Sequence, residues 1–568
     1  MSRSKTFFNE SGVAGFTHRA FVKAMGYDDT DMARPLIGIC NTFSELNPCH
    51  YHFGALAEAV KRGVWQAGGF PLEFPTISLN DVFASPTSML YRNLAAMDTE
   101  EMIRAQPLDG VVLLANCDKT TPAALMGAAS ADLPAILVSG GPMLSGHYKG
   151  QLLGACTDCR RLTAEYQAGT LDQATYKEIE DGIVRSVGHC MVMGTASTMN
   201  SIVEALGIAL PGNGAIPAPD SRRLRLAEAA GRQIVRLVEQ GLRPSQIMTR
   251  PAFENAITLL CALGGSTNAV VHLPAIAGRL GLELPLSLFD EISRRAPLIA
   301  NMRPAGQYQM EDLFHAGGIS AILKQLLPLL HGDALTVTGQ TLAESVAQAQ
   351  ILDPDVIRSL DNPLKGEGGL AVLRGNLAPD GAIIKHAAAS PQLLRHRGRA
   401  VVFRGLADLQ ARLNDPDLAV NHDDILVLQN VGPVGGPGMP EVGNFSIPGK
   451  LLKQGVRDMI RISDARMSGT AYGTIVLHVA PESAVGGPLA LVRDGDEIEL
   501  DVAERRLQLQ VDQAELARRR QAWQPPAAAF ERGYGRLFVE HVTQAPLGCD
   551  FDFLHGADPV QAAEQPKF

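Results

Sequence analysis

Residues 110–115, GVVLLA, constrain the fold more than any other stretch of the chain. Six consecutive apolar residues predict a short strand that is buried on both faces. Pro122 suits the first turn of a following helix, and Cys117, Asp118 and Lys119 lie between the two elements. A thiol, a carboxylate and an amine at the end of a buried strand are either exposed to solvent without a function or belong to a binding or catalytic site.

Strand and helix patterns alternate in the same way from about residue 34 to 140. Short apolar runs predict further strands, and an amphipathic pattern that ends at a Gly-Gly pair predicts a helix. The strands are expected at 36–40, 75–79 and 135–139, and the helix at 51–67. This alternation predicts an α/β domain with a largely parallel sheet.

The pattern of apolar and polar residues changes near residue 370. Helical patterns dominate from roughly 160 to 330, whereas short β-like runs with turn residues follow after 370. Residues 497–511, EIELDVAERRLQLQV, alternate apolar and polar side chains and predict a hairpin. We therefore expect two domains, an α/β domain over 1–370 and a β-barrel-like domain over 371–568.

Composition and charge limit the kinds of molecule that the chain is expected to bind. Of the 568 residues, 46% are hydrophobic and 19% are charged, which is typical of a packed globular enzyme. A formal net charge of -10, without a long Lys/Arg run, argues against nucleic acid or an anionic membrane as partner. The first residues lack the apolar stretch of a signal peptide, and eight scattered cysteines are typical of reduced thiols. We expect a cytoplasmic protein.

Three cysteines lie where a ligand site is expected. In an open α/β sheet, ligands bind beyond the carboxyl ends of the strands, near helix N-termini. Cys117 occupies such a point, Cys190 precedes a predicted helix at 195–206, and Cys49 lies in a polar loop. A helix N-terminus lowers the pKa of a thiol and favours the thiolate that metals bind. A lone cysteine is nevertheless usually a small buried apolar residue, and spacing alone does not favour a shared site.

Other short motifs indicate chemistry less clearly. Cys156 and Cys159 form a C-x-x-C, which suggests zinc or redox chemistry, but no second pair accompanies it, so two unrelated structural thiols are the simpler interpretation. The run CHYH, 49–52, also suggests zinc, less strongly than a site shared by the three cysteines. The sequence contains no H-E-x-x-H, P-loop or G-x-S-x-G signature of the hydrolase and nucleotide-hydrolysing classes.

Seven motifs occur in one order between about residues 34 and 555: PCHYH, CDKTTPAALMGA, SGGPM, GHCMVMGTASTMN, GGSTNA, GPVGGPGMPE and SDARMSGTAYG. Together they resemble the dihydroxy-acid dehydratase and phosphogluconate dehydratase family. The run RGYGRLFVEHVTQAPLGCDFDFL looks like the sugar-acid branch, which includes arabinonate and xylonate dehydratases. The resemblance implies an α/β N-terminal domain, a β-barrel-like C-terminal domain, and an active site between them.

The resemblance further implies an iron–sulfur enzyme that removes water from a 2,3-dihydroxy acid to form a 2-keto-3-deoxy acid. Matched residue by residue, Cys49, Cys117 and Cys190 would hold the cluster, which is [2Fe-2S] in many relatives and [4Fe-4S] in phosphogluconate-type members. Three cysteines leave one of the four terminal positions of a [2Fe-2S] cluster open. The open iron would act as a Lewis acid on the departing 3-hydroxyl.

A magnesium site is also implied by the resemblance. Asp81, Asp118, Glu441 and a carbamylated Lys119 match its ligands, and Mg²⁺ prefers oxygen ligands. Relatives carry either Asp or Glu at position 81, so the shorter Asp81 leaves direct or water-mediated binding open. Without the family match, an ordinary salt bridge with Asp118 is the simpler account of Lys119.

Ser468 matches the serine that is proposed as the base in this family, and Thr470 would help to polarise the site. A serine hydroxyl is a weak base at neutral pH, so it needs activation by a nearby cation or helix dipole. The simpler alternative is that Ser468 is a turn residue before Gly469.

These expectations describe a sugar-acid (aldonate) dehydratase with a small-molecule substrate, in a family that forms homodimers or homotetramers. One alternative is the biosynthetic dihydroxy-acid dehydratase, which converts 2,3-dihydroxyisovalerate to 2-ketoisovalerate, or an enzyme of broad specificity that does both. Another is a non-enzymatic iron–sulfur or metal-binding protein. The presence of Ser468, Lys119 and Glu441 beside the three cysteines argues against that last alternative.

Overall fold

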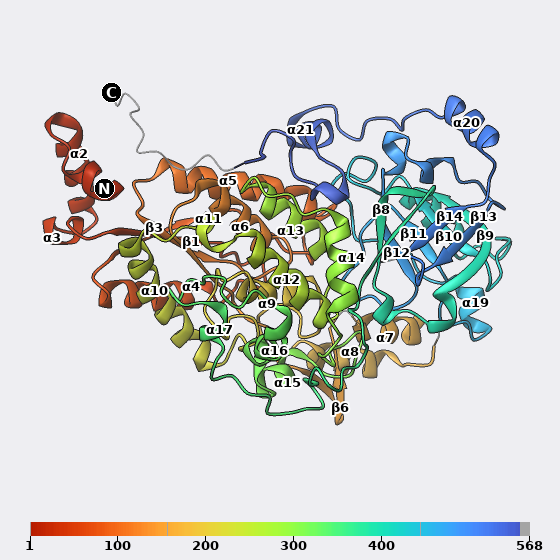
Figure 1. The fold of residues 1–568 in the computed structure, drawn as a ribbon, viewed down its shortest axis with the longest axis horizontal. Helices are drawn as coiled ribbons and strands as arrows, with labels where there is room; N and C mark the ends of the chain where they lie inside the picture. Colours follow the sequence, from red (N-terminus) through yellow and green to blue (C-terminus); the bar gives the residue numbers. More distant parts are fainter. Residues whose placement is uncertain (1, 156, 168, 444, 557–568) are drawn as a thin grey trace.

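The computed structural model describes residues 2–155, 157–167, 169–443 and 445–556. Figure 1 shows a helix-rich region, coloured red to green, beside a region of strands coloured green to blue. The helices of the first region are α1 (Arg3–Phe8), α2 (Gly12–Ala24), α3 (Asp29–Met32), α4 (Phe53–Gln66), η1 (Ser88–Tyr91), α5 (Arg92–Ala105), α6 (Thr120–Ala131), α7 (Thr157–Gln167), α8 (Gln173–Ile183), α9 (Thr195–Ala205), α10 (Ser221–Gln240), α11 (Pro244–Ile247), α12 (Arg250–Ala262), α13 (Ala269–Gly278), α14 (Leu286–Arg295), α15 (Met310–His315), α16 (Gly318–Leu326), η2 (Leu327–Leu329) and α17 (Leu342–Ser345).

A four-stranded parallel sheet forms the centre of the first region, in the order β2-β1-β3-β4 among the described residues. Its strands are β1 (Leu36–Asn41), β2 (Phe70–Pro75), β3 (Gly110–Leu114) and β4 (Ala135–Val138), and a short separate hairpin is formed by β5 (Gly146–Tyr148) and β6 (Gln151–Leu153). The parallel pairing confirms the fold class predicted for this part of the chain.

The strand predicted at 75–79 is wrong, because the sheet uses Phe70–Pro75 instead. Leu36 of β1 pairs with Phe70, which directly follows the Gly68-Gly69 turn. Proline cannot donate a ladder hydrogen bond and is confined in sheets to edges and strand ends. Pro71 and Pro75 fit here because β2 is the edge strand.

Alternate residues of β3 pack on opposite faces of the sheet. Val112 and Leu114 lie in the apolar core with side chains of α4 and α10, whereas Val111 and Leu113 pack with α5 and α6. All four side chains are buried. The sheet is therefore covered on both faces, as the uninterrupted apolar run predicts.

In the second region, eight described strands close into a barrel in the order β10-β11-β12-β8-β7-β14-β13-β9. They are β7 (Ala371–Gly375), β8 (Ala378–Ile384), β9 (Arg395–Arg404), β10 (Ile425–Gln429), β11 (Arg461–Ser463), β12 (Ile475–Ala480), β13 (Glu497–Asp501) and β14 (Arg506–Leu509). Ile498 pairs with Leu509 and Leu500 with Leu507, so the predicted hairpin is confirmed. Helical elements of this region are η3 (His386–Ala388), η4 (Pro391–Leu393), α18 (Leu406–Arg412), α19 (Gly449–Lys453), η5 (Ser483–Val485), η6 (Pro488–Leu491), α20 (Gln513–Ala522), α21 (Gly533–His541) and η7 (Ala545–Leu547).

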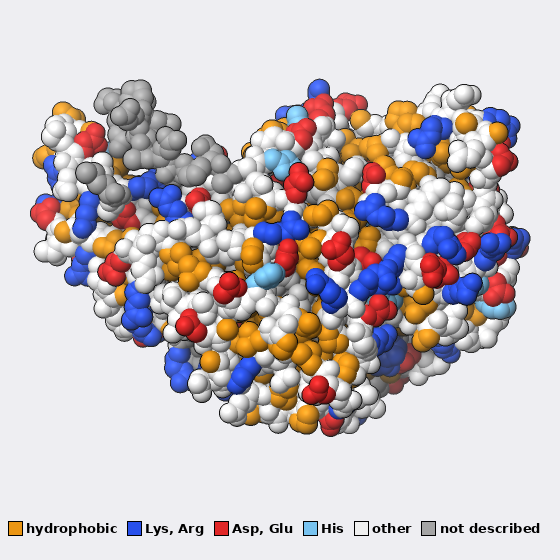
Figure 2. Space-filling model, viewed as in Figure 1, with side chains coloured by type: hydrophobic (Ala, Val, Ile, Leu, Met, Phe, Trp, Pro, Cys, Tyr) orange, Lys and Arg blue, Asp and Glu red, His pale blue; other side chains and the backbone are white. Residues whose placement is uncertain are grey.

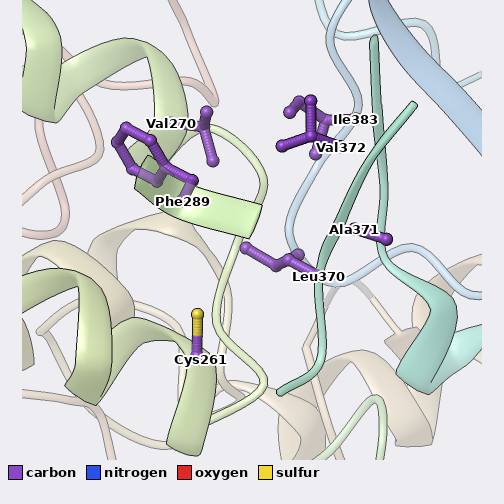
Figure 3. Close-up of a pocket in the computed structure, with 7 residues that line it drawn as sticks. All are labelled: Cys261, Val270, Phe289, Leu370, Ala371, Val372 and Ile383. Carbon is purple, nitrogen blue, oxygen red and sulfur yellow. The ribbon is translucent and has the colours of Figure 1, made fainter. Parts of the chain in front are cut away.

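A small apolar cavity lies where α12, α13 and α14 meet the first barrel strands (Figure 3). Burial raises the pKa of the Cys261 thiol at this cavity to about 12, so the thiol stays protonated at neutral pH. The cavity is a packing gap between the two regions and does not suit a polar substrate. Its lining residues are Cys261, Val270, Phe289, Leu370, Ala371, Val372 and Ile383.

The outer surface mixes charges of both signs. On the face drawn in Figure 2, acidic and basic side chains alternate without a broad area of one sign. Helix α2 stands at one end of the molecule (Figure 1) and exposes Phe16 and Phe21. None of the described helices has both the length and the apolar character that crossing a membrane requires.

Gly63 allows α4 and α10 to pack closely. A Cβ atom at residue 63 would lie only 1.9 Å from the backbone oxygen of Glu228 in α10. We expect Gly63→Ala to lower the free energy of unfolding by about 1–3 kcal/mol, because the two helices must move apart. Thermal and urea unfolding followed by circular dichroism measure this change.

The matched control for this prediction is Gly54→Ala in the same helix, where a Cβ atom meets nothing within 4 Å. Alanine has a higher helix propensity than glycine, so Gly54→Ala is expected to be neutral or slightly stabilising. Equal stability of the Gly63 and Gly54 variants would contradict the close packing of α4 and α10.

Candidate functional site

The predicted site residues of the first region lie in loops that follow the parallel strands. Cys49 lies between β1 and α4, Asp81 follows β2, and Cys117 to Lys119 connect β3 to α6. Parallel strands place their carboxyl ends at one edge of the sheet, which is where such folds bind ligands. The topology therefore brings these loops together although they are far apart in the sequence.

Three carboxylates surround the ammonium group of Lys119. Its Nζ atom lies 3.1 Å from the Asp81 carboxylate, 3.4 Å from Asp118 Oδ2 and 3.6 Å from Glu441 Oε1. The Lys119 side chain has no exposed surface, whereas that of Asp81 keeps 32% of its exposure. The structure thus brings all four predicted magnesium ligands into one cluster that is open to solvent at Asp81.

Two residues that were not predicted hold Glu441 in this cluster. Arg466 Nη1 donates to Glu441 Oε1 at 3.1 Å, and Asn268 Nδ2 donates to the same oxygen at 2.8 Å. Arg466 is fully buried, and its Nε atom donates to the Met439 carbonyl at 2.8 Å. Both residues belong to motifs that the sequence displays, SDARMSG and GGSTNA, but spacing alone does not reveal that they meet Glu441.

The crowded carboxylates change one another's pKa values. Burial alone would raise the pKa of Asp81, but the Lys119 charge and hydrogen bonds from Asp118 and Ser88 lower it to about 2. Burial and the charge of Asp81 raise the pKa of Asp118 well above its usual range. An excess of carboxylate over positive charge is the condition that a divalent cation relieves.

One atom each from Asp81, Cys117 and Asp118 lies within 4.8 Å of the others, the only such group found in the described residues. Carboxylate oxygens suit a hard cation, whereas thiolate sulfur suits iron or another soft metal. The donor set therefore fits a magnesium site on the side of the carboxylates and a thiolate-bound metal on the side of Cys117.

Interaction with the Cys49 thiol, burial and the charges of Asp81 and Asp118 raise the pKa of Cys117 well above its ordinary value. The predicted lowering of this thiol pKa by the α6 N-terminus is therefore wrong, because the neighbouring groups and burial outweigh the helix dipole. A bound metal would displace the thiol proton.

Cys190 lies in a segment that is joined to the Cys49 loop. Gly188 N donates to the Pro48 carbonyl at 3.3 Å, and Cys190 Sγ donates to the Ala155 carbonyl at 3.3 Å. The Cys190 sulfur does not belong to the close group formed by Asp81, Cys117 and Asp118. The backbone bond between Gly188 and Pro48 brings the Cys190 segment next to the Cys49 loop.

His50 and Asn116 hold the Cys49 and Cys117 loops together. Asn116 Nδ2 donates to the Cys49 carbonyl at 3.0 Å. His50 Nδ1 donates to the Thr42 carbonyl at 2.7 Å, and its Nε2 accepts from the backbone amides of Asn116 and Cys117 at 3.2 and 3.1 Å. Both ring nitrogens are used within the protein, so His50 is not available as the zinc ligand that CHYH suggests.

The remaining cysteines lie away from this site or outside the described residues. Burial raises the pKa of Cys40 and of Cys549 to about 12, as it does for Cys261, so these thiols stay protonated. Cys159 is exposed on α7. Cys156 lies outside the described residues, so the nature of the C-x-x-C pair stays a prediction.

Ser468 and Thr470 form a turn between β11 and β12 that lies against the first region. Ser468 Oγ is 2.8 Å from Thr470 Oγ1, and the Thr470 amide donates to Ser468 Oγ at 3.4 Å. A Cβ atom on Gly469 would lie 2.6 Å from Ser266 Cβ and 3.0 Å from the backbone nitrogen of Thr195, the first residue of α9. The turn therefore packs tightly on a helix N-terminus.

Hydrogen bonds link Thr195 and Ser266, on which the serine turn packs, to the carboxylate cluster. Thr195 Oγ1 lies 2.9 Å from Ser266 Oγ, and Asn268 Nδ2 donates to Thr195 Oγ1 at 2.9 Å. The same Asn268 group donates to Glu441. Ser468 thus lies in a turn that packs on a short polar network, and that network ends at the predicted magnesium ligand Glu441.

Known dehydratases match almost the whole chain. Residues 34–345 match the description "Dihydroxy-acid/6-phosphogluconate dehydratase N-terminal", and residues 355–549 match the corresponding C-terminal description. The L-arabonate dehydratase of Azospirillum brasilense is 53% identical over 577 residues, 100% of this chain and 98% of the relative. The L-arabinonate dehydratase of Rhizobium leguminosarum bv. trifolii is 52% identical over 557 residues, 98% and 96% of the two chains. The dihydroxy-acid dehydratase of Syntrophobacter fumaroxidans is 43% identical over 547 residues, 95% and 97% of the two chains.

Replacement of His50 tests the scaffold of the cysteine loops. We expect His50→Leu to lower the free energy of unfolding at pH 7.5 by about 1–3 kcal/mol for each backbone amide that loses its acceptor. Burial lowers the pKa of His50 to about 3, so wild type should lose this contribution as the pH falls from about 6.5 towards 3, when only the unfolded chain binds the proton. Urea unfolding at several pH values measures the difference between the two proteins.

Tyr51→Leu is the control for this prediction, because the Tyr51 residue is 57% exposed and follows His50 directly. Its stability should stay near wild type at every pH. A constant difference between wild type and His50→Leu from pH 7.5 to 5 would show that the imidazole is not held neutral by burial.

Proposed function

The chain belongs to the dihydroxy-acid/6-phosphogluconate dehydratase family of hydro-lyases, and on this premise we propose that it converts a sugar (aldonic) acid to its 2-keto-3-deoxy acid by loss of the 3-hydroxyl as water. Identity of 52–53% to two arabinonate dehydratases, against 43% to a dihydroxy-acid dehydratase, supports the sugar-acid substrate. The observation that carries the chemistry is the cluster of Asp81, Asp118, Lys119 and Glu441 beside Cys117.

Cys49, Cys117 and Cys190 would hold an iron–sulfur cluster, [2Fe-2S] or less favourably [4Fe-4S]. The contact between two of the three thiols and the tie between the segments of Cys49 and Cys190 support this assignment. A [2Fe-2S] cluster with three cysteine ligands keeps one terminal position open. When bound, the cluster supplies Lewis acidity towards the 3-hydroxyl, and magnesium supplies positive charge towards the carboxylate and 2-hydroxyl of the substrate.

Asp81, Asp118, Glu441 and a carbamylated Lys119 would hold the magnesium ion. Carbamylation joins the neutral lysine amine to carbon dioxide with loss of one proton, and it replaces a cation by an oxygen ligand. The three carboxylates that already surround Lys119 Nζ within 3.1 to 3.6 Å support this set. Arg466 and Asn268 would keep Glu441 oriented towards the ion.

Ser468 would act as the base, in its deprotonated form. Its Oγ atom takes the proton from C2 and returns it to the 3-hydroxyl, which departs as water, and the resulting enol tautomerises to the ketone. The hydroxyl and the amide of Thr470 and the positive end of α9 lie where they favour the serine alkoxide. Activation of the serine thus has structural support in addition to the magnesium ion.

A substrate panel tests the proposed function. Enzyme is prepared anaerobically with Mg²⁺, its iron and sulfide contents are measured, and 2-keto acid formation is followed with pentonates, hexonates, glycerate and 2,3-dihydroxyisovalerate. We expect kcat/KM for one sugar acid to exceed that for dihydroxyisovalerate by about 10-fold or more. Chelation with EDTA should abolish turnover, and Mg²⁺ should restore it.

A preference for 2,3-dihydroxyisovalerate in this panel would assign the chain to the biosynthetic alternative. Comparable turnover of both classes would indicate an enzyme of broad specificity. If enzyme with a complete iron–sulfur cluster forms no 2-keto acid from any of these acids, the proposed function is contradicted.

Removal of the serine hydroxyl tests the proposed base. We expect Ser468→Ala to lower kcat by about 10²- to 10⁴-fold with little change in KM, because the variant binds substrate but lacks the proton acceptor. The control is Ser287→Ala, at an exposed position of α14 far along the chain from the site. Iron content equal to wild type would separate loss of the base from loss of the cluster, and an unchanged kcat would reject Ser468 as the base.

A further inference from the structure

Lys385 is a buried lysine that the proposed function does not use. It directly follows strand β8, and only 8% of the residue is exposed. Its Nζ atom donates to the carbonyl oxygen of Gly469 at 3.3 Å. Within the described part of the chain, the Lys385 ammonium has no carboxylate within 4.0 Å, in contrast to Lys119.

A buried ammonium without a carboxylate is costly, and an apolar side chain of similar length would fill the same space without that cost. Burial lowers the pKa of Lys385 to about 7, and no described carboxylate opposes this shift. The next residue along the chain is the titratable His386, which faces Glu367, and Glu367 in turn pairs with Arg505. None of them forms an ion pair with Lys385. Packing alone therefore does not explain why this position is a lysine, whereas a role in the site that contains the serine turn does explain it.

Among the described residues, the Lys385 ammonium donates its hydrogen bond to the middle peptide of the serine turn. The Gly469 carbonyl lies between Ser468 and Thr470, whose hydroxyl groups are 2.8 Å apart. On its other side the turn packs against Ser266 and the Thr195 amide. Lys385 from the barrel and α9 from the first region thus hold the turn from two sides, and both present positive charge to it.

Resting on the proposed function, we propose that Lys385 is a positioning residue for Ser468. Its hydrogen bond to the Gly469 carbonyl fixes the orientation of the Ser468 hydroxyl. The protonated form of Lys385 favours the serine alkoxide over the hydroxyl, and the alkoxide in turn favours protonation of Lys385. No bond to substrate is formed by Lys385, so it acts only through the turn.

Two substitutions of Lys385 distinguish the effect of its positive charge from the effect of its hydrogen bond to the Gly469 carbonyl. Lys385→Met removes both, whereas Lys385→Gln keeps a donor and removes the charge. We expect Lys385→Met to lower kcat by about 10- to 100-fold, with KM within about 3-fold of wild type, because a misplaced base affects the chemical step. The acidic limb of its kcat–pH profile should move about one unit to higher pH, since loss of a nearby cation raises the pKa of the base.

Lys385→Gln should show the same shift of the pH profile with a smaller loss of kcat, and Lys385→Arg should restore both towards wild type. The matched control is Lys365→Met, which removes one lysine charge just before the barrel at a residue that does not contact the serine turn. Iron content and thermal stability are measured for every variant. An unchanged pH profile in both charge-removing variants, or a loss of kcat that follows loss of iron, would overturn the proposal.

Hydrogen exchange of the holoenzyme gives a readout that does not depend on turnover. The Ala471 amide donates to the Ser468 carbonyl at 2.9 Å within the turn. In Lys385→Met the peptide that covers 466–472 should exchange faster than in wild type, whereas Lys365→Met should leave it unchanged. If wild type dehydrates no acid in the panel, the proposed function fails, and this exchange measurement alone decides the positioning role. Equal exchange in wild type and Lys385→Met would overturn it.

Discussion

The buried ammonium of Lys119 is the charge on which the arrangement of the site depends. It lies among the carboxylates of Asp81, Asp118 and Glu441, which come from loops of both regions of the chain. Removal of one partner of a buried charge cluster leaves the others uncompensated, which is strongly destabilising. The strand ends of the first region and the loop that carries Glu441 are therefore held in one relative position by electrostatics as well as by packing.

This constraint explains the polar residues that surround the cluster. Arg466 and Asn268 satisfy Glu441, and Asn268 continues through Thr195 to Ser266, on which Gly469 packs. Buried polar groups need partners, so each member orients the next. The N-terminus of α9 and the predicted magnesium ligand Glu441 consequently belong to one hydrogen-bonded network. The turn of the proposed base packs on this network, and Lys385 donates to that turn from the barrel side.

The loops that carry Cys49 and Cys117 are held together by neutral groups rather than by charges. His50 accepts two backbone amides of the Cys117 loop, and Asn116 donates to the Cys49 carbonyl. The Cys49 thiol, burial and the charges of Asp81 and Asp118 raise the pKa of Cys117. Oxygen donors, which suit hard cations, and a sulfur donor, which suits soft metals, thus adjoin at Asp118 and Cys117.

The sequence by itself determined the local elements and the family of this protein. The apolar run before Cys117, the hairpin at Ile498 and the ordered motifs are local patterns, and local periodicity is what a single sequence displays. Only the tertiary structure decided that β2 begins at Phe70, that Arg466 meets Glu441, that Lys385 reaches Gly469 and that the Cys117 thiol keeps its proton. Those outcomes follow from edge position, burial and contacts between distant segments, which arise only when the chain is packed.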